Sequence, residues 1–238
     1  MFTTKTLSFL RSLKRNNQRE WFHARKDQYE QHCRQPLLSV IERLADDFAA
    51  FAPEHIADAR VSPLRPYRDT RFSEDKTPLK THVGATFPHR VLGRMNGAWF
   101  YFEVAPGWVW IGGGMWRPDT AQLQLVREHI ARNLDEFEAI VSAPAFRKVG
   151  GLQGDRLTRI PRGFAKGHPA ADYLQHRQFM AFREDAPTLA TSKQFYAQLR
   201  STFEAIAPFV AFLNEPLIES YSSSPSGTRD FHSATTFR

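Results

Sequence analysis

The stretch AWFYFEVAPGWVWIGGGMW, residues 98–116, decides the fold. Two runs rich in aromatic and β-branched residues flank the dipeptide Pro106-Gly107, whose residue types suit the two central positions of a type II turn. The stretch therefore predicts a β-hairpin. With a two-residue turn, the facing pairs are Ala105 with Trp108, Glu103 with Trp110 and Phe102 with Ile111.

Side chains alternate between the two faces of a strand, so this hairpin has one apolar face and one amphipathic face. The apolar face, which we expect in the core, carries Phe100, Phe102, Val104, Val109 and Ile111. The other face carries Trp99, Tyr101, Glu103, Trp108 and Trp110. Two interpretations of that second face stay open: burial under a helix with Glu103 neutralised by an arginine, or the floor of a ligand pocket. Both require a partner for Glu103, because an unpaired buried carboxylate is costly.

Apolar residues at helical spacing flank the hairpin on both sides. We expect helices at residues 7–13, from about 19 through 33, and at 36–51, 118–141, 170–176 and 192–213, with a short strand at 156–160 and an extended segment at 179–185. The sequence thus predicts a single α+β domain, residues 1–218. Its central sheet, antiparallel or mixed, includes the hairpin near 98–114 and packs with N-terminal and C-terminal helices. The serine-rich residues 219–238 have the composition of a disordered tail.

The densest run of charge, RPYRDTRFSEDKTPLKTHVG at residues 65–84, lies a short distance before the hairpin. Residues 60–94 carry a surplus of five positive charges, residues 145–166 carry the same surplus, and the whole chain has a net charge of +7. Positive charge confined to two segments favours a local site for an acidic ligand, which requires that the two segments converge on one hollow. The competing interpretation is two solvated loops that are basic.

Arginine guanidinium groups are planar forks that match phosphate and carboxylate, and lysines add point charges. If residues 65–71 are extended, Arg65 and Arg71 share one side and build most of an anion clamp, with Arg68 on the other side. Asp69 and Asp75 could hold the arginines, and in an enzyme either would be the expected catalytic proton acceptor. The alternative is a loop that compensates its own charges. The candidate ligand-binding residues are Arg65, Arg68, Arg71, Lys76, Lys80, Glu103, Gly113, Gly114, Arg117, Arg159 and Arg162.

Gly113 and Gly114 belong to this set because a strand, a glycine loop and a helix that begins near Pro118 resemble an anion cradle, with Arg117 just before the helix. The resemblance is weak, since the sequence contains neither G-x-x-x-x-G-K-[ST] nor G-x-G-x-x-G.

Two further chemistries have little support. Ser73 and Lys76 have the S-x-x-K form of penicillin-binding enzymes, but Pro78 opposes the helix which that chemistry needs. Asp69, Asp75, Glu103 and His82 could bind a metal, but their spacing matches no metal-binding motif. We therefore expect no metal site, and the sequence identifies no cofactor.

Four segments carry a resemblance to a known family: FLRSLKRNNQREWFHARKDQYE, YRDTRFSEDKTPLKTHVGA, GGGMWRPDTAQLQLVREHI and LTRIPRGF. Together they resemble the domain of unknown function 2461, a family of uncharacterised bacterial and fungal proteins, over nearly the whole chain before the tail. The resemblance assigns no activity. It implies as family-motif positions Arg68, Asp69, Arg71, Phe72, Asp75, Lys76, Pro78 and Lys80, together with Asn17, Trp21 and Phe22. Leu79 stands where an aromatic residue is common in the family.

Three classes of function remain open. The first is binding of a small phosphate- or carboxylate-bearing ligand in an Arg/Lys-lined pocket, with hydrolase or transferase activity left open. The second is nucleic-acid binding, in which the basic segments contact phosphates and exposed Trp99, Tyr101 or Trp108 stack on bases. The third is a protein-interaction module. We expect a cytoplasmic protein without a membrane partner, because there is no run of eighteen apolar residues, no apolar signal segment and only one cysteine. The oligomeric state is not predicted.

Overall fold

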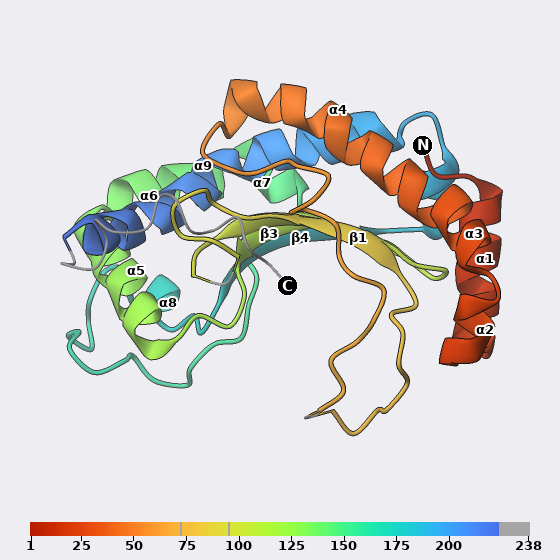
Figure 1. The fold of residues 1–238 in the computed structure, drawn as a ribbon. Coiled ribbons are helices and arrows are strands. Elements are labelled where there is room, and N and C mark those ends of the chain that lie inside the picture. Colours follow the sequence, from red (N-terminus) through yellow and green to blue (C-terminus); the bar gives the residue numbers. More distant parts are fainter. Residues whose placement is uncertain (72, 95, 224–238) are drawn as a thin grey trace.

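The computed structural model describes residues 1–71, 73–94 and 96–223 and shows an α+β fold. A four-stranded antiparallel sheet in the order β1-β2-β3-β4 lies at its centre (Figure 1). The strands are β1 (Val83–Phe87), β2 (Trp99–Val104), β3 (Val109–Met115) and β4 (Phe179–Asp185). This confirms the predicted fold class.

Helices lie before, between and after the strands. The N-terminal group is α1 (Thr4–Arg15), α2 (Arg19–His23), α3 (Lys26–Tyr29), the π-helical turn η1 (Glu30–Arg34) and α4 (Gln35–Phe51). After β3 come α5 (Thr120–Arg132), α6 (Leu134–Ser142), α7 (Pro144–Lys148) and α8 (Ala171–Leu174), and after β4 come the 3-10 turn η2 (Pro187–Thr191) and α9 (Phe195–Ser222). Among the helices in the described ranges, none has the length and apolar character needed to cross a bilayer.

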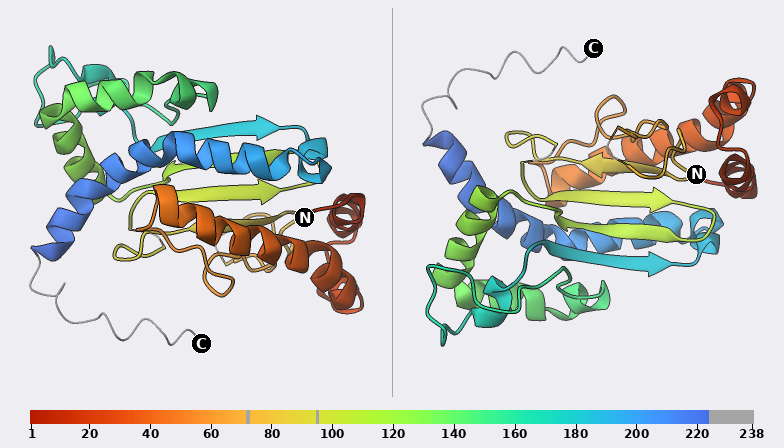
Figure 2. Two further views of the ribbon diagram at one scale, coloured as in Figure 1. Left: turned by 90° about the horizontal axis from the view of Figure 1, so that it is seen from above. Right: turned by 90° about the horizontal axis from the view of Figure 1, so that it is seen from below.

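One face of the sheet is covered and the other is open. Helices α4 and α9 lie across the covered face, whereas the view from below shows the strands without a helix over them (Figures 1 and 2). We call this open face the underside. The covered face holds the core, in which Phe48 of α4 and Phe203 of α9 meet Phe100 of β2 with ring centroids 5.2 Å from it in each case. Rings packed at this distance contribute beyond the area they bury.

The predicted hairpin is confirmed in detail. Phe102 faces Ile111 and Glu103 faces Trp110, and the Ala105 N–H donates to the Trp108 carbonyl (2.9 Å) across the turn. The predicted apolar face is fully buried. The amphipathic face lies on the underside, where the strands have no helix over them. The interpretation that a helix buries this face was therefore wrong.

Several predicted elements differ from the structure. The helix expected at 118–141 is divided into α5 and α6 at Asn133. The helix expected at 19–33 is interrupted at residues 24–25, and its second part continues through α3 and η1 into α4. The strand expected at 156–160 is wrong, because within those residues only an isolated bridge from Arg156 to His176 forms. Helix α9 continues to Ser222, past the predicted boundary at residue 219; the rest of the predicted tail, residues 224–238, lies outside the described part of the chain.

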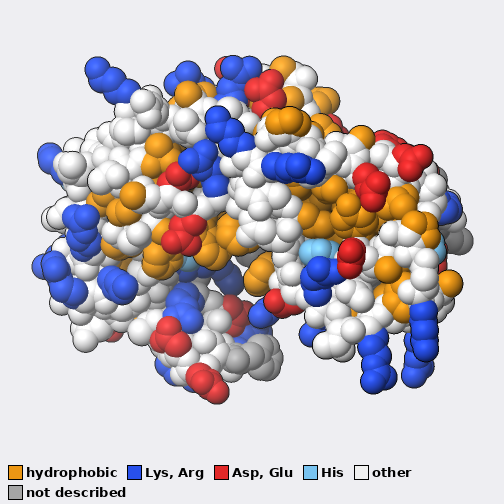
Figure 3. All heavy atoms as spheres, turned by 180° about the vertical axis from the view of Figure 1, so that it is seen from behind, with side chains coloured by type: hydrophobic (Ala, Val, Ile, Leu, Met, Phe, Trp, Pro, Cys, Tyr) orange, Lys and Arg blue, Asp and Glu red, His pale blue; other side chains and the backbone are white. Residues whose placement is uncertain are grey.

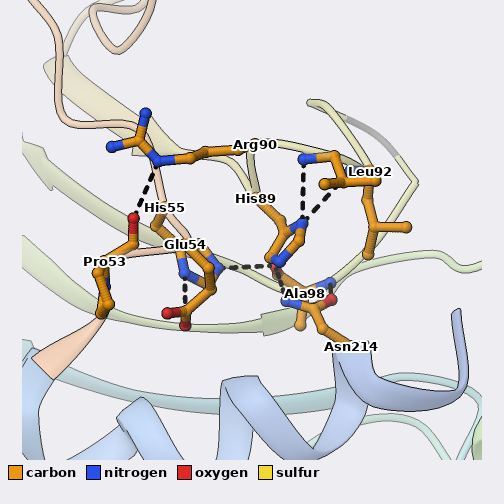
Figure 4. A network of polar contacts seen from close by, with 9 residues as sticks. Pro53, Glu54, His55, His89, Arg90, Leu92, Ala98 and Asn214 are labelled. Atoms are coloured by element: carbon orange, nitrogen blue, oxygen red, sulfur yellow. Dashed lines mark hydrogen bonds and ion pairs between the residues drawn. The ribbon is translucent and has the colours of Figure 1, made fainter. Parts of the chain in front are cut away.

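A buried polar junction ties α9 to the start of β2 (Figure 4). The Ala98 N–H donates to Asn214 Oδ1 (2.7 Å), and Asn214 Nδ2 donates back to the Ala98 carbonyl (3.0 Å). Beside it, two buried imidazoles, His55 and His89, lie 5.4 Å apart, and Glu54 contacts His55 Nδ1 at 3.1 Å. The backbone N–H of Val91 donates to His89 Nδ1 (3.2 Å), which requires that this nitrogen carry no proton.

Irregular segments pair with both outer strands of the sheet. On β1, the Thr86 N–H donates to the Ser62 carbonyl and the Leu64 N–H donates to the Gly84 carbonyl, both at 2.9 Å. On β4, Gln153 and Met180 exchange backbone hydrogen bonds of 2.7 and 3.0 Å. Part of the backbone at each edge of the sheet is therefore paired.

Candidate functional site

The charged run is a two-stranded arm, residues 62–82, that projects below the sheet beside β1 (Figure 1). Backbone hydrogen bonds join its two sides: the Lys80 N–H donates to the Pro66 carbonyl (2.8 Å), and the Arg68 N–H donates to the Pro78 carbonyl (2.9 Å). Proline has no N–H to donate, and here both prolines act as acceptors. The prolines that exclude a helix are therefore compatible with this extended pairing.

The tip of the arm compensates its own charges. Arg68 forms an ion pair with Asp75 and donates to Thr77 Oγ1 (2.5 Å). Arg71 binds Asp69 through two side-chain hydrogen bonds of 3.0 and 2.7 Å. Lys76, also at the tip, donates to the Thr70 carbonyl (3.0 Å). For Arg68 and Arg71 the alternative of an internally compensated loop fits better than the predicted clamp.

These contacts also affect the two predicted proton acceptors. Hydrogen bonds from Arg71 lower the pKa of Asp69 to about 2. The Thr77 N–H and the Arg68 guanidinium lower the pKa of Asp75 to about 2. A general base works best when its pKa lies near the operating pH, so both carboxylates are weak proton acceptors at neutral pH.

The base of the arm is fixed to the N-terminal helices by Asn17. Its Nδ2 donates to the Leu79 carbonyl (2.9 Å), and the Leu79 N–H donates to its Oδ1 (3.0 Å). Tyr67 of the arm packs edge-on against Phe22 of α2, with ring centroids 5.9 Å apart. The first and the second family motifs are therefore parts of one structural unit, which their separation in the sequence does not reveal.

A basic pocket of about 380 Å³ lies between the arm and the N-terminal helices. We call it the cationic pocket; its charged lining is Lys26, Glu30, Arg34, Arg60 and Arg65, and its apolar lining includes Phe22, Tyr29 and Leu37. Glu30 is already paired with Arg34 (3.4 Å). The other three cations have no ion-pair contact with an acid among the described residues.

Two further cations lie near Arg65. Burial, followed by the nearby charges of Arg65 and Arg94, lowers the pKa of Lys80. The Lys80 ammonium has no hydrogen bond or ion pair within the described part of the chain. Arg94 donates to Thr86 Oγ1 (3.2 Å) and to the Val61 carbonyl (3.0 Å), which holds its guanidinium at the base of the arm. Positive charge therefore accumulates around Arg65.

Glu103 has partners other than the expected arginine. Its carboxylate accepts from Trp108 Nε1 (2.6 Å) and from the Tyr101 hydroxyl (2.5 Å), and His82 Nε2 lies 3.3 Å away. Burial and the neighbouring Glu103 charge raise the pKa of Tyr101, so its hydroxyl keeps its proton and donates a hydrogen bond to the carboxylate. Burial lowers the pKa of His82, although Glu103 acts in the opposite direction. The amphipathic face of the hairpin thus supplies two hydrogen bonds to its own acid.

The two basic segments flank opposite edges of the sheet. The arm precedes β1, and the loop with Arg159 and Arg162 precedes β4, which is the other outer strand. The two loops project on either side of a hollow under the sheet (Figure 3). Arg159 and Arg162 are exposed and do not line the cationic pocket, so the predicted convergence of the two segments on one pocket does not occur there.

The glycine run does not form an anion cradle. Gly113 and Gly114 lie inside β3 rather than in a loop before the next helix. The N-terminus of α5 is capped by Asp119, whose Oδ1 accepts from the Gln122 N–H (2.8 Å), so an acid already occupies this position. Arg117, the remaining residue of this prediction, has a positive φ of 51°.

No cluster of three or more potential metal-binding side chains occurs among the residues that the structure describes. Cys33 is buried, and burial raises the pKa of its thiol to about 12. A thiol of this kind is unreactive at neutral pH, as expected for a core residue.

These features define a class of α+β protein with one antiparallel sheet, helices on one face and a charged arm beside the open face. The chain belongs to the family described as conserved hypothetical protein (DUF2461), whose model matches residues 5–212. No curated protein and no solved structure matches the chain.

The sequence identified some residues of the cationic pocket and missed others. Arg65 was predicted from the charge surplus, and Arg60 lies within the same basic segment. Lys26 and Arg34 were missed, since they lie on the N-terminal helices and only the folded chain brings them to the arm. The signal that could have indicated this is Asn17, a family-motif residue next to the end of the first predicted helix.

Proposed function

We propose that the protein binds a small phosphate- or carboxylate-bearing molecule in the cationic pocket, with Arg65 as the principal contact and the nearby Lys80 adding positive charge. The observation that carries this proposal is the charge balance of the pocket. Four cationic side chains line it against one acid, and that acid already has a partner in Arg34. An anionic ligand would supply the negative charge that the surrounding side chains lack.

The shape and lining of the pocket favour an organic anion over a bare ion. Its volume of about 380 Å³ exceeds what phosphate alone needs and is in the range of sites for small molecules. Phe22, Tyr29 and Leu37 give it an apolar wall opposite the arm. A ligand with a carbon skeleton and one or two acidic groups matches both sides.

Lys80 and Arg94, which lie near Arg65, add positive charge to the same region. Like charges at close range destabilise one another, which is one reason why the pKa of Lys80 lies below its ordinary value. An anion next to Lys80 would remove part of this repulsion and raise that pKa. By linkage, binding should therefore be stronger when Lys80 is protonated.

The proposal is limited to ligand binding. Catalytic turnover remains a prediction made from the sequence. The lowered pKa values of Asp69 and Asp75 favour an ion-pairing role for both over proton transfer. Hydrolase or transferase activity would need a different proton acceptor.

The test is a thermal-shift titration of the full chain with pyrophosphate and with citrate at constant ionic strength. A ligand at one hundred times its Kd stabilises the native state by about 2.7 kcal/mol, which for a chain of this size raises the Tm by roughly 5–10 °C. Arg65→Gln and Lys80→Met should each raise the apparent Kd by about tenfold, because the first removes a charge-assisted contact and the second removes a nearby positive charge. Arg159→Gln is the matched control, since this exposed arginine lies beyond the opposite edge of the sheet.

Two results would count against the proposal. One is the absence of any shift with either anion. The other is binding of short oligonucleotides with a log-linear loss of affinity in salt, equally affected by Arg159→Gln and Arg65→Gln, which would favour the nucleic-acid alternative.

A further inference from the structure

A second pocket, of about 660 Å³, lies on the underside of the sheet, and we call it the underside pocket. Its centre is Gly112 on β3, which faces Tyr101 on β2 and Phe182 on β4 in the strand register. Trp110 lies at one end of β3 and Trp116 just beyond the other, and both line the pocket. Aromatic side chains therefore surround a floor without a side chain.

Gly112 keeps this floor open. A Cβ at this position would lie 2.3 Å from the Ala181 carbonyl oxygen and 2.4 Å from Phe182 Cβ, so a side chain is excluded. The Trp110 wall is held by its indole N–H, which donates to Glu184 (2.5 Å), and its ring lies 5.2 Å from that of Phe182. The pocket is thus formed before any ligand enters, which reduces the entropic cost of binding.

Gln178 supplies a polar group without a partner. The residue is only 9% exposed and lines the underside pocket. Its side-chain amide has no hydrogen bond with any residue in the described ranges. The amide atoms of Gln178 are not among the fully buried polar atoms that lack a partner, so they are accessible from the pocket. A ligand with a hydrogen-bonding edge can bind this amide.

An adjoining pocket of about 590 Å³ continues the groove and shares Trp116, Asp155 and Gln178 with it. Arg117 and Arg177 line this part. Neither guanidinium has a side-chain ion pair or hydrogen bond among the described residues, and Asp155 is the acid in the same lining.

Arg117 has an unfavourable backbone conformation. Its φ of 51° lies in the left-handed region, and it is the non-glycine residue with positive φ in the described chain. Its guanidinium carbon lies 5.5 Å from the centre of the Trp116 ring. Strain of this kind is typical of residues whose position serves a ligand.

We propose that the underside groove binds a planar aromatic molecule that carries an anionic group. The ring lies on Gly112 between the aromatic walls, and its edge meets the Gln178 amide. The anionic group reaches Arg117 and Arg177. This site has no lining residue in common with the cationic pocket, and the proposal does not depend on that function.

The test compares two fluorescent probes that differ in charge: 8-anilinonaphthalene-1-sulfonate and the neutral N-phenyl-1-naphthylamine. The full-length native protein is titrated with each at constant ionic strength, and near-UV circular dichroism confirms that its tertiary packing is unchanged. We expect saturable binding of both probes at one site, with the sulfonate bound about tenfold more tightly.

Arg117→Gly is the decisive variant, because glycine adopts positive φ without strain. It should lower the affinity for the sulfonate by about tenfold and leave the affinity for the neutral probe unchanged. It should also raise the Tm by roughly 2–4 °C. Arg177→Gln should lower the affinity for the sulfonate by the same factor without raising the Tm. Arg159→Gln is the matched control, because this exposed arginine lines neither part of the underside groove, and it should change the affinity of neither probe.

The proposal is overturned if Arg117→Gly and Arg177→Gln leave the ratio of the two affinities unchanged, or if Arg159→Gln abolishes the preference for the sulfonate. Failure of Arg117→Gly to fold would not protect the proposal, because Arg177→Gln tests the same contact at an ordinary backbone position.

Discussion

Replacing Asn17 with alanine should detach the arm from the N-terminal helices. The substitution removes both hydrogen bonds between Asn17 and the Leu79 backbone. Leu79 is 1% exposed, so its N–H and carbonyl would lose their partners with little access to water. Each buried backbone group left unpaired costs about 1–3 kcal/mol. Because the arm can shift and admit water, we expect a loss of about 2–4 kcal/mol, a large part of the stability of an ordinary domain.

Urea denaturation measures this loss, with the slope m compared between variants to confirm that the unfolding transition is the same. Hydrogen exchange gives the location: protection should fall first at the amides of Leu79 and Lys80. Asn16→Ala is the matched control. The Asn16 side chain makes one exposed hydrogen bond, to the Ser12 carbonyl (2.9 Å), and its removal should cost less than about 1 kcal/mol. Equal losses for the two variants, or unchanged exchange at Leu79, would refute the reasoning.

Three further predictions concern buried or half-buried titratable groups. Burial and the nearby His55 lower the pKa of His89 to about 4, from 6.5. The unfolded chain therefore binds the His89 proton more tightly than the folded chain, so stability that is present above pH 6.5 is lost as the pH falls toward 4. This loss is worth about 2 kcal/mol after allowance for solvent screening. His89→Gln should abolish the loss, as measured by urea denaturation at pH 6.5 and at pH 4. Glu103→Leu should cost more stability than Glu103→Gln, because leucine leaves the Trp108 indole N–H without an acceptor whereas glutamine retains one acceptor oxygen; equal unfolding midpoints would show that these hydrogen bonds contribute little. Citrate affinity should weaken as the pH rises through the lowered pKa of Lys80, and titration calorimetry of Lys80→Met should show a flatter pH profile; an unchanged profile would place the titrating group elsewhere.

The sequence predicted those parts of the fold that local patterns determine. Pro106-Gly107 and the alternation on each side of it determine the register of β2 and β3, and the structure has that register. Strand β1 was missed, because its five residues include a glycine and follow a charged run, so no alternation is visible. The glycines after Ile111 indicated a loop, yet they extend β3, since only glycine permits its close approach to β4.

The candidate site was predictable only in part. A surplus of positive charge near Arg65 is visible in the sequence, but its distribution in space is not. The ion pairs at the tip are local, between residues seven and two positions apart, and they pair Arg68 and Arg71 with acids of the arm itself. Lys26 and Arg34 of the pocket come from helical segments that Asn17 links to the arm.

The backbone pairing at both outer strands has a consequence for solubility. An unpaired strand edge can recruit a strand from another molecule and so start aggregation. At β1, Ser62 and Leu64 of the arm pair with the strand edge. At β4, Gln153 pairs with the strand edge. Loosening the arm would therefore do more than weaken ligand binding: it would uncover a template for intermolecular β-pairing, and self-association should accompany the loss of the arm contacts.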